Sequence, residues 1–183
     1  VGEMDAGPVW AHRAFAMRSA PKSSLYRREV TEAAVAAVTE ALQSFARGEH
    51  PVAAAELGVA ARGRARPLCR QADRAIDWNR DDTATVIRKI HSADGNPGLR
   101  DEILGRPVRL FGAHEEGRLR GSTPGEIVAT RHGGILRATR DGAVWISHLQ
   151  AIREGGEPTL KLPATEVLGE ALAGIAEIAY AVD

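Results

Sequence analysis

The first clear pattern in the chain is a set of apolar residues at helical spacing. Its members are Tyr26, Val30, Ala33, Ala34, Ala37, Val38, Ala41, Leu42 and Phe45. Recurrence every three or four residues predicts an amphipathic helix. Ser23 and Ser24 suit its N-cap, and Gly48 suits its C-terminal end. The preceding residues 1–22 fit loop and short extended pieces and supply no sheet, so we expect the broad apolar face of this helix to need a partner surface.

A second helix is predicted after the segment Ile76-Asp77-Trp78. Asp81 or Asp82 suits its N-cap. Its apolar stripe consists of Thr83, Val86, Ile87 and Ile90, and Asn96-Pro97-Gly98 is typical of the turn that ends it. Between the two helices, residues 49–66 have the Ala, Gly and Pro content of a linker.

From residue 99 onward, short apolar runs alternate with turn signals, which is typical of β-structure. The predicted strands are Leu99–Leu104, Val108–Ala113, Glu126–Thr130, Ile135–Thr139 and Ala143–Leu149. Gly112–Gly121 fits a polar loop. Five short strands with close turns favour a small closed barrel over an open sheet. Leu160–Gly169 fits an extended piece and a short helix beginning near Pro163, and the tail from Glu170 onward fits a helix or a connector.

Charge and composition narrow the function classes. Lys and Arg number 24, as do Asp and Glu, and aromatic residues make up 4%. A net charge of zero argues against bulk binding of nucleic acid or anionic membranes. The single cysteine, Cys69, allows no internal disulfide and suits a cytoplasmic location. No apolar run has the length of a membrane span, and no secretory signal is expected.

Asp5 is the residue that most resembles part of a catalytic loop. It lies in Met4-Asp5-Ala6-Gly7-Pro8, and a carboxylate followed by a Gly-Pro turn is typical of a catalytic loop at a strand end. A lone carboxylate cannot perform acid–base chemistry without a second group. None of the six histidines stands in a setting that marks it as the partner of Asp5. Either Asp5 is structural, or the chain is part of a larger protein.

For each of the other candidate sites, a purely structural role is an alternative to a functional one. The arginine cluster Arg62–Arg74 fits either a solvated connector or a strap that binds phosphate groups. Cys69 lies among these arginines and fits either an activated thiol or an ordinary small side chain. The acid pairs Glu115-Glu116 and Asp81-Asp82 fit a solvated loop and a helix cap, so we expect no metal site.

The order of these features resembles the methionyl-tRNA formyltransferase superfamily. An Asp-x-Gly loop, a helix, a linker, the Ile76-Asp77-Trp78 motif with its capped helix, Asn96-Pro97-Gly98 and a barrel follow one another as in those enzymes. Longer stretches resemble its hydrogenase maturation branch, the HypX or HoxX family. They include residues 22–31, 70–78, 135–146 and 161–164. The resemblance places Asp5 on the catalytic aspartate of the superfamily.

The resemblance implies a larger protein than this chain. HypX-like proteins have a formyltransferase domain, an OB-like middle domain and an enoyl-CoA hydratase-like domain. The resemblance also implies the cofactors 10-formyltetrahydrofolate and coenzyme A, formyl transfer through formyl-CoA, and the carbon monoxide ligand of nickel–iron hydrogenase as product. The catalytic Asn and His of the family lie upstream of the aspartate. We therefore expect the isolated chain to be catalytically incomplete and to bind neither cofactor tightly.

The expected fold is α+β, with the C-terminal tail of a Rossmann-like formyltransferase domain followed by a small OB-like β-barrel. The expected boundaries are 1–50 for the catalytic remnant, 51–66 for the linker, 67–169 for the OB-like domain and 170–183 for a tail toward a missing domain. The exposed first helix is expected to permit a homodimer. Two alternatives stay open: a C-terminal module that binds RNA or coenzyme A, as in methionyl-tRNA formyltransferase, and a non-functional remnant.

Overall fold

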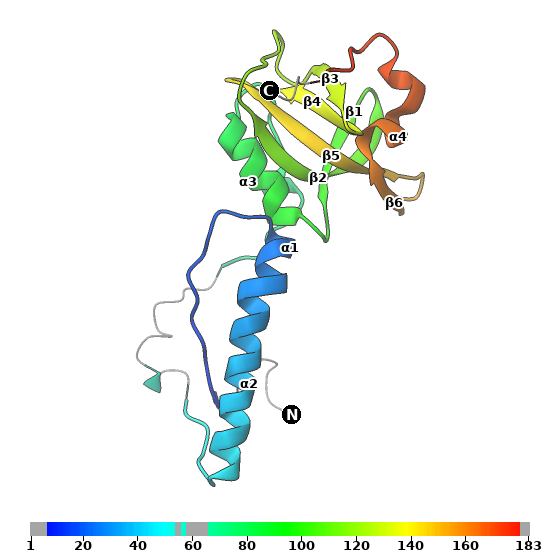
Figure 1. The fold of residues 1–183 in the computed structure, drawn as a ribbon. Helices are drawn as coiled ribbons and strands as arrows, with labels where there is room; N and C mark the ends of the chain where they lie inside the picture. Colours follow the sequence, from blue (N-terminus) through cyan, green and yellow to red (C-terminus); the bar gives the residue numbers. More distant parts are fainter. Residues whose placement is uncertain (1–6, 54–55, 58–65, 180–183) are drawn as a thin grey trace. The chain divides into compact units, whose positions relative to one another are not determined.

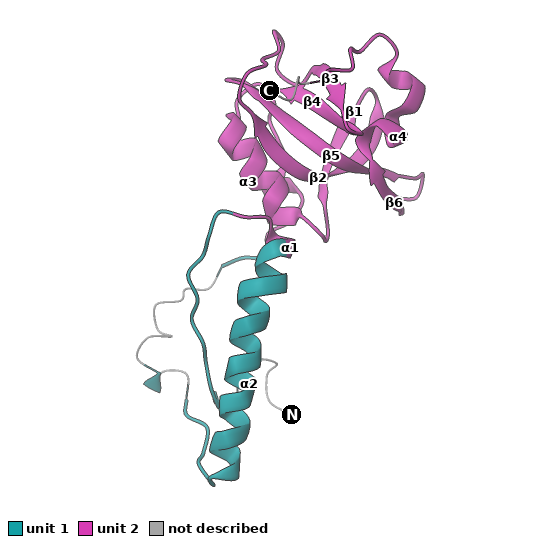
Figure 2. Cartoon of the chain, viewed as in Figure 1, with its two compact units in different colours: residues 1–19, 24–68 teal, residues 20–23, 69–183 magenta. Residues whose placement is uncertain are grey.

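The computed structural model describes residues 7–53, 56–57 and 66–179, and the chain divides into two compact units (Figure 1, Figure 2). Unit 1 comprises residues 1–19 and 24–68, and unit 2 comprises residues 20–23 and 69–183. The predicted boundaries at residues 50, 66 and 169 stay a prediction. Among the described residues, no helix is both long enough and apolar enough to cross a membrane.

Unit 1 is built around one long helical segment. The segment begins with α1 (Lys22–Leu25), whose first two residues belong to unit 2, continues through a π-helical turn (Tyr26–Val30) and becomes α2 (Thr31–Ala46). Gly48 follows at a φ of 74°, as expected for the end of a helix. The extended N-terminal segment pairs with the chain that follows α2, because Val9 and Val52 exchange backbone hydrogen bonds of 2.8 and 3.0 Å.

The two serines predicted as N-caps do not cap this helix, because both lie inside α1. Ser23 Oγ donates to Asp94 at 2.5 Å, and Ser24 Oγ accepts from Arg18. Lys22 donates to the carbonyl of Asn96. Tertiary hydrogen bonds therefore take the hydroxyl groups that a helix end would have used.

Unit 2 contains an antiparallel sheet of six strands. They are β1 (Leu99–Ile103), β2 (Arg106–Glu116), β3 (Ile127–Arg131), β4 (Gly134–Ala138), β5 (Ala143–Ile152) and β6 (Pro158–Pro163). The spatial order is β1-β2-β5-β4-β3, and β6 also pairs with β5. β4 pairs with the first half of β5, and β6 pairs with its second half.

The α+β class is confirmed, but the sheet is not closed, since no pairing between described strands joins β1 to β3. Two of the predicted boundaries also change. Strand β2 extends to Glu116 into the predicted loop, because residues 113–116 pair with Ala143–Ile146 of β5. β6 adds a sixth strand where an extended piece was expected.

Tight turns set the register of two hairpins. Leu104 and Gly105 join β1 to β2 at φ values of 50° and 73°, and His132 and Gly133 join β3 to β4 at 48° and 78°. Two successive residues with positive φ are typical of type I′ turns, whose twist matches that of paired strands. The second turn places Arg131 and His132 side by side at the end of the β3–β4 hairpin.

One face of the sheet carries the main core. Helix α3 (Thr83–Ala93) packs its Val86, Ile90 and Ala93 there, and α4 (Ala164–Leu168) adds Ala164 and Leu168. The strands contribute Leu99, Ile103, Val108, Leu110, Ala113, Ile135, Val144, Ile146 and Leu149. The predicted stripe of α3 and the short helix after Pro163 are both confirmed.

A smaller cluster occupies a second side of the sheet. It consists of Ala129, Leu136, Ala143 and Trp145, against which Leu119, Val128 and Ile178 pack. Ile178 belongs to the C-terminal tail, which follows a 3₁₀ turn at Gly169–Leu172. The tail pairs in parallel with β3, because Thr130 donates to Ala176 O and Ile178 donates to Thr130 O, each at 2.9 Å. This tail is therefore neither a long helix nor a plain connector.

Candidate functional site

The predicted catalytic residue, Asp5, lies outside the described residues, so its role stays a prediction. The histidines of unit 1, His12 and His50, are exposed. In unit 2, His91 lies on α3 as expected, and its Nε2 is 2.7 Å from the carbonyl oxygen of Ala113. His114 lies in β2 instead of the predicted loop, because β2 is longer than its apolar run. His91 is thus held by a structural contact.

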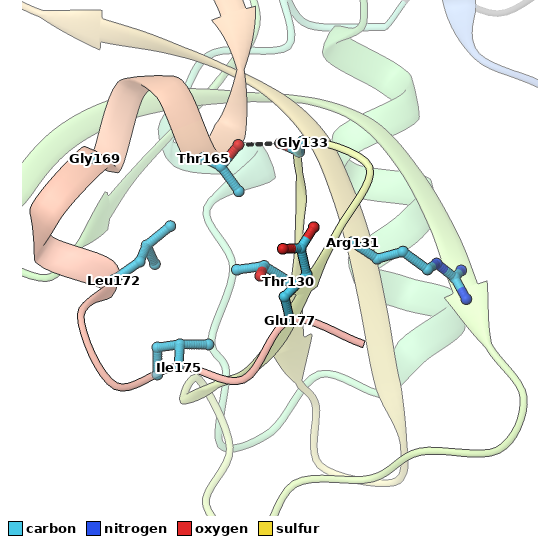
Figure 3. A pocket seen from close by; sticks show the side chains of 8 residues that line it. All are labelled: Thr130, Arg131, Gly133, Thr165, Gly169, Leu172, Ile175 and Glu177. Atoms are coloured by element: carbon cyan, nitrogen blue, oxygen red, sulfur yellow. Dashed lines mark hydrogen bonds between the residues drawn. The ribbon is translucent and has the colours of Figure 1, made fainter. Parts of the chain in front are cut away.

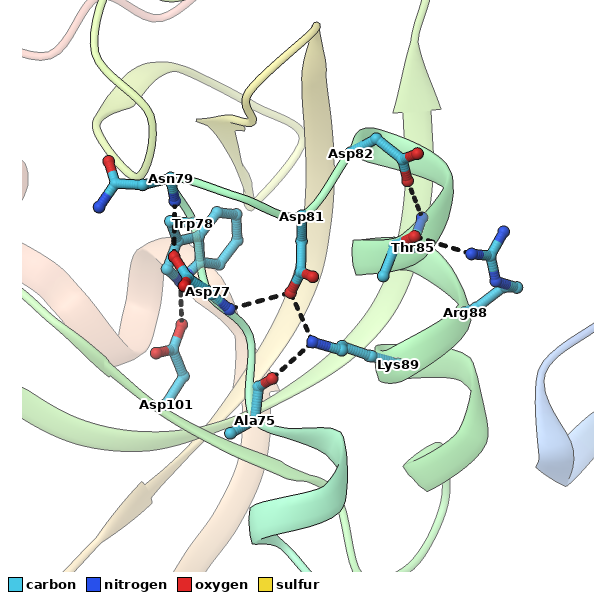
Figure 4. A network of polar contacts seen from close by, with 10 residues as sticks. All are labelled: Ala75, Asp77, Trp78, Asn79, Asp81, Asp82, Thr85, Arg88, Lys89 and Asp101. Carbon is cyan, nitrogen blue, oxygen red and sulfur yellow. Dashed lines mark hydrogen bonds and ion pairs between the residues drawn. The ribbon is translucent and has the colours of Figure 1, made fainter.

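The Ile76-Asp77-Trp78 motif lies in unit 2 within a network of polar contacts (Figure 4). Asp81 Oδ2 accepts from the backbone N–H of Asp77 at 2.9 Å and from Lys89 Nζ at 2.5 Å. Lys89 also donates to the carbonyl of Ala75 at 2.7 Å. The motif is thereby fastened to the side of α3, which makes it a structural junction rather than a catalytic site.

Trp78 joins this junction to the sheet. Its Nε1 donates to Asp101 Oδ2 at 3.0 Å, and the guanidinium carbon of Arg137 lies 3.9 Å from the centre of its ring (Figure 4 shows the indole beside Asp101). Arg137 Nη1 donates to the same carboxylate oxygen at 2.5 Å. Burial lowers the pKa of Arg137, and Asp101 opposes this effect. The three side chains form one half-buried unit with its charges paired.

Two carboxylates satisfy the N-terminal amides of α3. Asp82, the predicted N-cap, accepts from the backbone N–H of Thr85 at 2.7 Å. Asp141, from the β4–β5 turn, accepts from the N–H and the hydroxyl of Thr83 at 2.8 and 2.9 Å. Hydrogen bonds from Thr85 lower the pKa of Asp82, and those from Thr83 lower the pKa of Asp141. The second cap is a tertiary contact between residues 58 positions apart.

The arginine cluster does not form a uniform strap in its described part. Arg62 and Arg64 lie outside the described residues, and Arg66 belongs to unit 1. Arg74 is buried and donates to the carbonyl of Cys69 at 2.7 Å. The Arg74 side chain therefore has a structural role inside unit 2. Cys69 itself is exposed.

Two pockets in unit 2 that share one lining residue were not predicted from the sequence. The larger, about 330 Å³, lies between the β3–β4 hairpin, α4 and the tail (Figure 3). Its lining is Thr130, Arg131, Gly133, Thr165, Gly169, Leu172, Ile175 and Glu177. The smaller, about 170 Å³, is lined by His114, Arg131, His132, Gly134, Trp145 and Ser147. Arg131 lines both pockets. The sequence signals only a turn at residues 131–134, because the lining comes from distant segments.

Metal binding has no support in the described part of the chain, where no three His, Cys, Asp or Glu side chains gather as a ligand set. The acid pairs have other roles. Asp81 and Asp82 hold Lys89 and the start of α3. Glu116 accepts from the indole of Trp145 at 2.7 Å and from the N–H of Arg118 at 2.7 Å.

Comparison with known proteins identifies the class. Residues 69–158 match the model of the formyl transferase C-terminal domain. Methionyl-tRNA formyltransferase from Pseudothermotoga lettingae is 36% identical over 84 residues, which are 46% of this chain and 28% of that enzyme. These matches agree with the open antiparallel sheet and with the Ile76-Asp77-Trp78 motif that precedes the capped helix α3. They show that the chain belongs to the formyltransferase superfamily.

Within this superfamily the chain is similar over its full length to hydrogenase maturation proteins. It is 48% identical over 182 residues to the hydrogenase maturation factor HoxX from Bradyrhizobium diazoefficiens, covering 98% of this chain and 30% of that protein. The crystal structure of HypX from Aquifex aeolicus in complex with tetrahydrofolic acid matches with a TM-score of 0.85 and 41% identity, over 100% of this chain and 32% of that one. The chain thus spans about a third of the length of these relatives. The predicted resemblance to HypX and HoxX is confirmed.

Proposed function

We propose that this chain is part of a HypX-like formyltransferase. Such an enzyme takes the formyl group of 10-formyltetrahydrofolate, carries it as formyl-CoA and yields the carbon monoxide ligand of nickel–iron hydrogenase. The observation that carries the proposal is the 48% identity to HoxX over 182 residues. The tetrahydrofolic acid bound to HypX from Aquifex aeolicus supports the folate part. The coenzyme A step rests on the family resemblance.

In this proposal Asp5 is the carboxylate of the catalytic centre. Formyl transfer passes through a tetrahedral oxyanion, which a donor such as an Asn amide or a protonated His must stabilise. A carboxylate hydrogen-bonded to that His orients its ring and helps to move the proton of the acceptor. The Asn and His would come from the formyltransferase domain that the family places before the aspartate. The enoyl-CoA hydratase-like domain would follow this chain.

A chimera tests this function and the role of Asp5 together. Residues 1–183 replace the matching third of HoxX from Bradyrhizobium diazoefficiens, and hydrogenase activity is measured in cells that lack their own HoxX. We expect the chimera to restore hydrogenase activity and Asp5→Asn to abolish the restoration. Glu3→Gln changes a neighbouring acid in the same segment and serves as the matched control. A chimera that accumulates as soluble protein but restores nothing would contradict the proposal, and full activity of Asp5→Asn would contradict the role of Asp5.

RNA binding is a second candidate, and the match to methionyl-tRNA formyltransferase favours it. The zero net charge argues against it. A filter-binding titration of the chain with tRNA at several salt concentrations separates the two functions. Binding through phosphate contacts weakens linearly in a plot of log affinity against log salt. We expect no such salt-dependent binding from a HypX-like middle domain.

A further inference from the structure

The larger pocket lies on one side of strand β3 and is built from three segments that hydrogen bonds hold together. The tail is fixed to β3 by the bridge between Thr130 and Glu177. Helix α4 is fixed to the β3–β4 hairpin, because the N–H of Thr165 donates to the carbonyl of Gly133 at 2.9 Å. The volume of about 330 Å³ falls at the lower end of the range for small-molecule sites, ~300–1,000 Å³. The pocket therefore has fixed walls and room for a small ligand.

Three side chains that carry oxygen line this pocket. Thr130 and Thr165 contribute hydroxyls and Glu177 contributes a carboxylate, which Figure 3 shows next to Thr130 and directed toward the β3–β4 hairpin. The Thr165 hydroxyl donates to the carbonyl of Gly133 at 3.3 Å, so its lone pairs can still accept. Within the described part of the chain, the Glu177 carboxylate has neither a hydrogen bond nor an ion pair. The pocket thus offers hydrogen-bond acceptors and an uncompensated negative charge.

Arg131 is the basic residue in the described lining, and its charged end is directed away from these acceptors. Figure 3 shows its side chain extending away from Thr165 and Glu177. Its guanidinium carbon lies 4.4 Å from the centre of the ring of Trp145, which belongs to the second cluster of the sheet. A cation over an indole face is stabilised by the ring quadrupole. The charge beside the acceptors is therefore that of Glu177.

The chain that forms two of the walls is acidic. Residues 164–179 contain Glu166, Glu170 and Glu177 but no lysine or arginine. Arg106 of β2 reaches this segment, where it donates to the carbonyl of Leu168 at 2.9 Å, but it is not part of the described lining. Charges of one sign around a concave surface raise the local concentration of ions of the opposite sign. The pocket therefore favours a cation.

The rest of the lining shows which kind of cation fits. Leu172 and Ile175 are half-buried and lie on the tail side of the pocket (Figure 3). Methylene groups placed against these two side chains are removed from water, which is favourable. An ammonium group has three N–H donors and no acceptor, so it matches one carboxylate and two hydroxyls. A metal ion would gain nothing from the aliphatic wall.

We propose that this pocket binds a small primary alkylamine in its protonated form. The ammonium group donates to Glu177, Thr130 and Thr165, and the aliphatic body lies against Leu172 and Ile175. No step of the formyl transfer proposed above uses these residues, so the two proposals can fail separately.

Titration of the 183-residue chain at neutral pH, followed by amide NMR spectra, tests the site with three probes. The probes are butylammonium, methylammonium and 1-butanol. We expect butylammonium to bind saturably with a dissociation constant of about 1 mM. Methylammonium lacks the aliphatic body and should bind about fivefold more weakly or worse. The uncharged 1-butanol should show no saturable binding. The shifts caused by butylammonium should centre on Gly133, Thr165 and Ile175.

Three variants identify the groups that bind. Glu177→Gln keeps the size of the side chain but removes its charge, and it should weaken butylammonium about tenfold or more. Thr165→Val removes one acceptor and should weaken binding as well, which keeps the test open if Glu177→Gln fails to fold. Glu166→Gln changes an exposed glutamate of α4 outside the described lining and is the matched control, with wild-type affinity expected.

Four results would overturn the proposal. Butylammonium shows no saturation at tens of millimolar, or 1-butanol binds as tightly as butylammonium does. A folded Glu177→Gln chain binds butylammonium like the wild type, or Glu166→Gln loses as much affinity as Glu177→Gln.

Discussion

Arg137 is a buried arginine whose side chain contacts several segments of unit 2. It is 8% exposed and reaches three parts of unit 2, because it donates to Asp101 Oδ2 at 2.5 Å and to Gly125 O at 2.7 Å and covers Trp78. A charge removed from water is stabilising only while its partners are in place. Arg137, on β4, therefore helps to hold Trp78 of the Ile76-Asp77-Trp78 motif and Asp101 of β1 in place.

Arg137→Met should lower the free energy of unfolding by about 3–5 kcal/mol, because it leaves Asp101 as an uncompensated half-buried charge. Urea unfolding of unit 2, followed by tryptophan fluorescence, measures this change. Adding Asp101→Asn should recover part of the loss, since the second substitution removes the orphaned charge. Arg153→Met, at an exposed turn, is the control. A loss below about 1 kcal/mol in Arg137→Met would show that the pair contributes little.

The two carboxylates at the start of α3 predict how stability depends on pH. Hydrogen bonds lower the pKa of Asp141 and Asp82 in the folded state below the ordinary value of 3.8. At a pH near 3.8 the unfolded chain therefore binds more protons than the folded one, and the free energy of unfolding rises with pH. The two carboxylates contribute their full stabilisation when the pH is above their unfolded pKa of 3.8. This contribution is lost as the pH falls through their lowered pKa values in the folded state.

Asp141→Asn should flatten this dependence, because the amide oxygen can still accept from Thr83 but does not titrate. The measurement is the thermal midpoint at pH 3 and at pH 6 for both proteins. The difference between the two midpoints should be smaller in the variant. Arg140→Gln changes the charge of the adjacent residue without touching these hydrogen bonds and should keep the wild-type difference. An unchanged difference in Asp141→Asn would show that its carboxylate does not contribute.

Among the helices and strands, α2 and the C-terminal tail differ in how far their apolar side chains are buried. The tail buries Ile178 against the second cluster and pairs with β3. Helix α2 has no buried residue, and Val35, Val38, Leu42 and Phe45 are each 59–69% exposed. These four positions recur at three- and four-residue spacing, so they form one stripe along the helix. An exposed apolar stripe of this kind favours association.

We expect the isolated chain to form a homodimer through this stripe of α2. Leu42→Glu places a charge in the middle of the stripe and should shift the chain to a monomer in sedimentation equilibrium. Arg28→Gln changes a charge in the π-helical turn outside the stripe and should leave the association unchanged. A wild-type chain that is monomeric at concentrations used for NMR would contradict the expectation. In a longer protein, a neighbouring domain would take the place of the second copy.

At the scale of the whole molecule, the chain covers about a third of HoxX and HypX. The purified 183-residue chain should therefore show no formyl transfer from 10-formyltetrahydrofolate, because a carboxylate alone stabilises no oxyanion. Release of tetrahydrofolate, followed by absorbance with coenzyme A as acceptor, measures the activity. The chimera with HoxX serves as the positive control. Robust turnover by the isolated chain would contradict the expectation.

Elements whose signals are local could be predicted from the amino-acid sequence alone. The spacing of Val86 and Ile90, the cap at Asp82 and the turns at residues 105 and 133 lie within a few residues of the structures they specify. The Ile76-Asp77-Trp78 motif with its capped helix, which is part of the family resemblance, is a local signal of the same kind. Helical periodicity and turn-forming residues depend only on neighbours that are close in the sequence. The predicted helix α3 and the two predicted turns are therefore confirmed.

Features that join distant segments could be recognised only in the folded chain. Asp141 caps a helix 58 residues away, Arg137 pairs with Asp101 across the sheet, and residues 112–116 continue β2 although their sequence is polar. The same holds for the open sheet and for the pockets that share Arg131. Strand pairing forms hydrogen bonds between backbone N–H and C=O groups, so a polar segment can also join a strand. Contacts between residues that are distant in the sequence leave no periodic pattern along the chain.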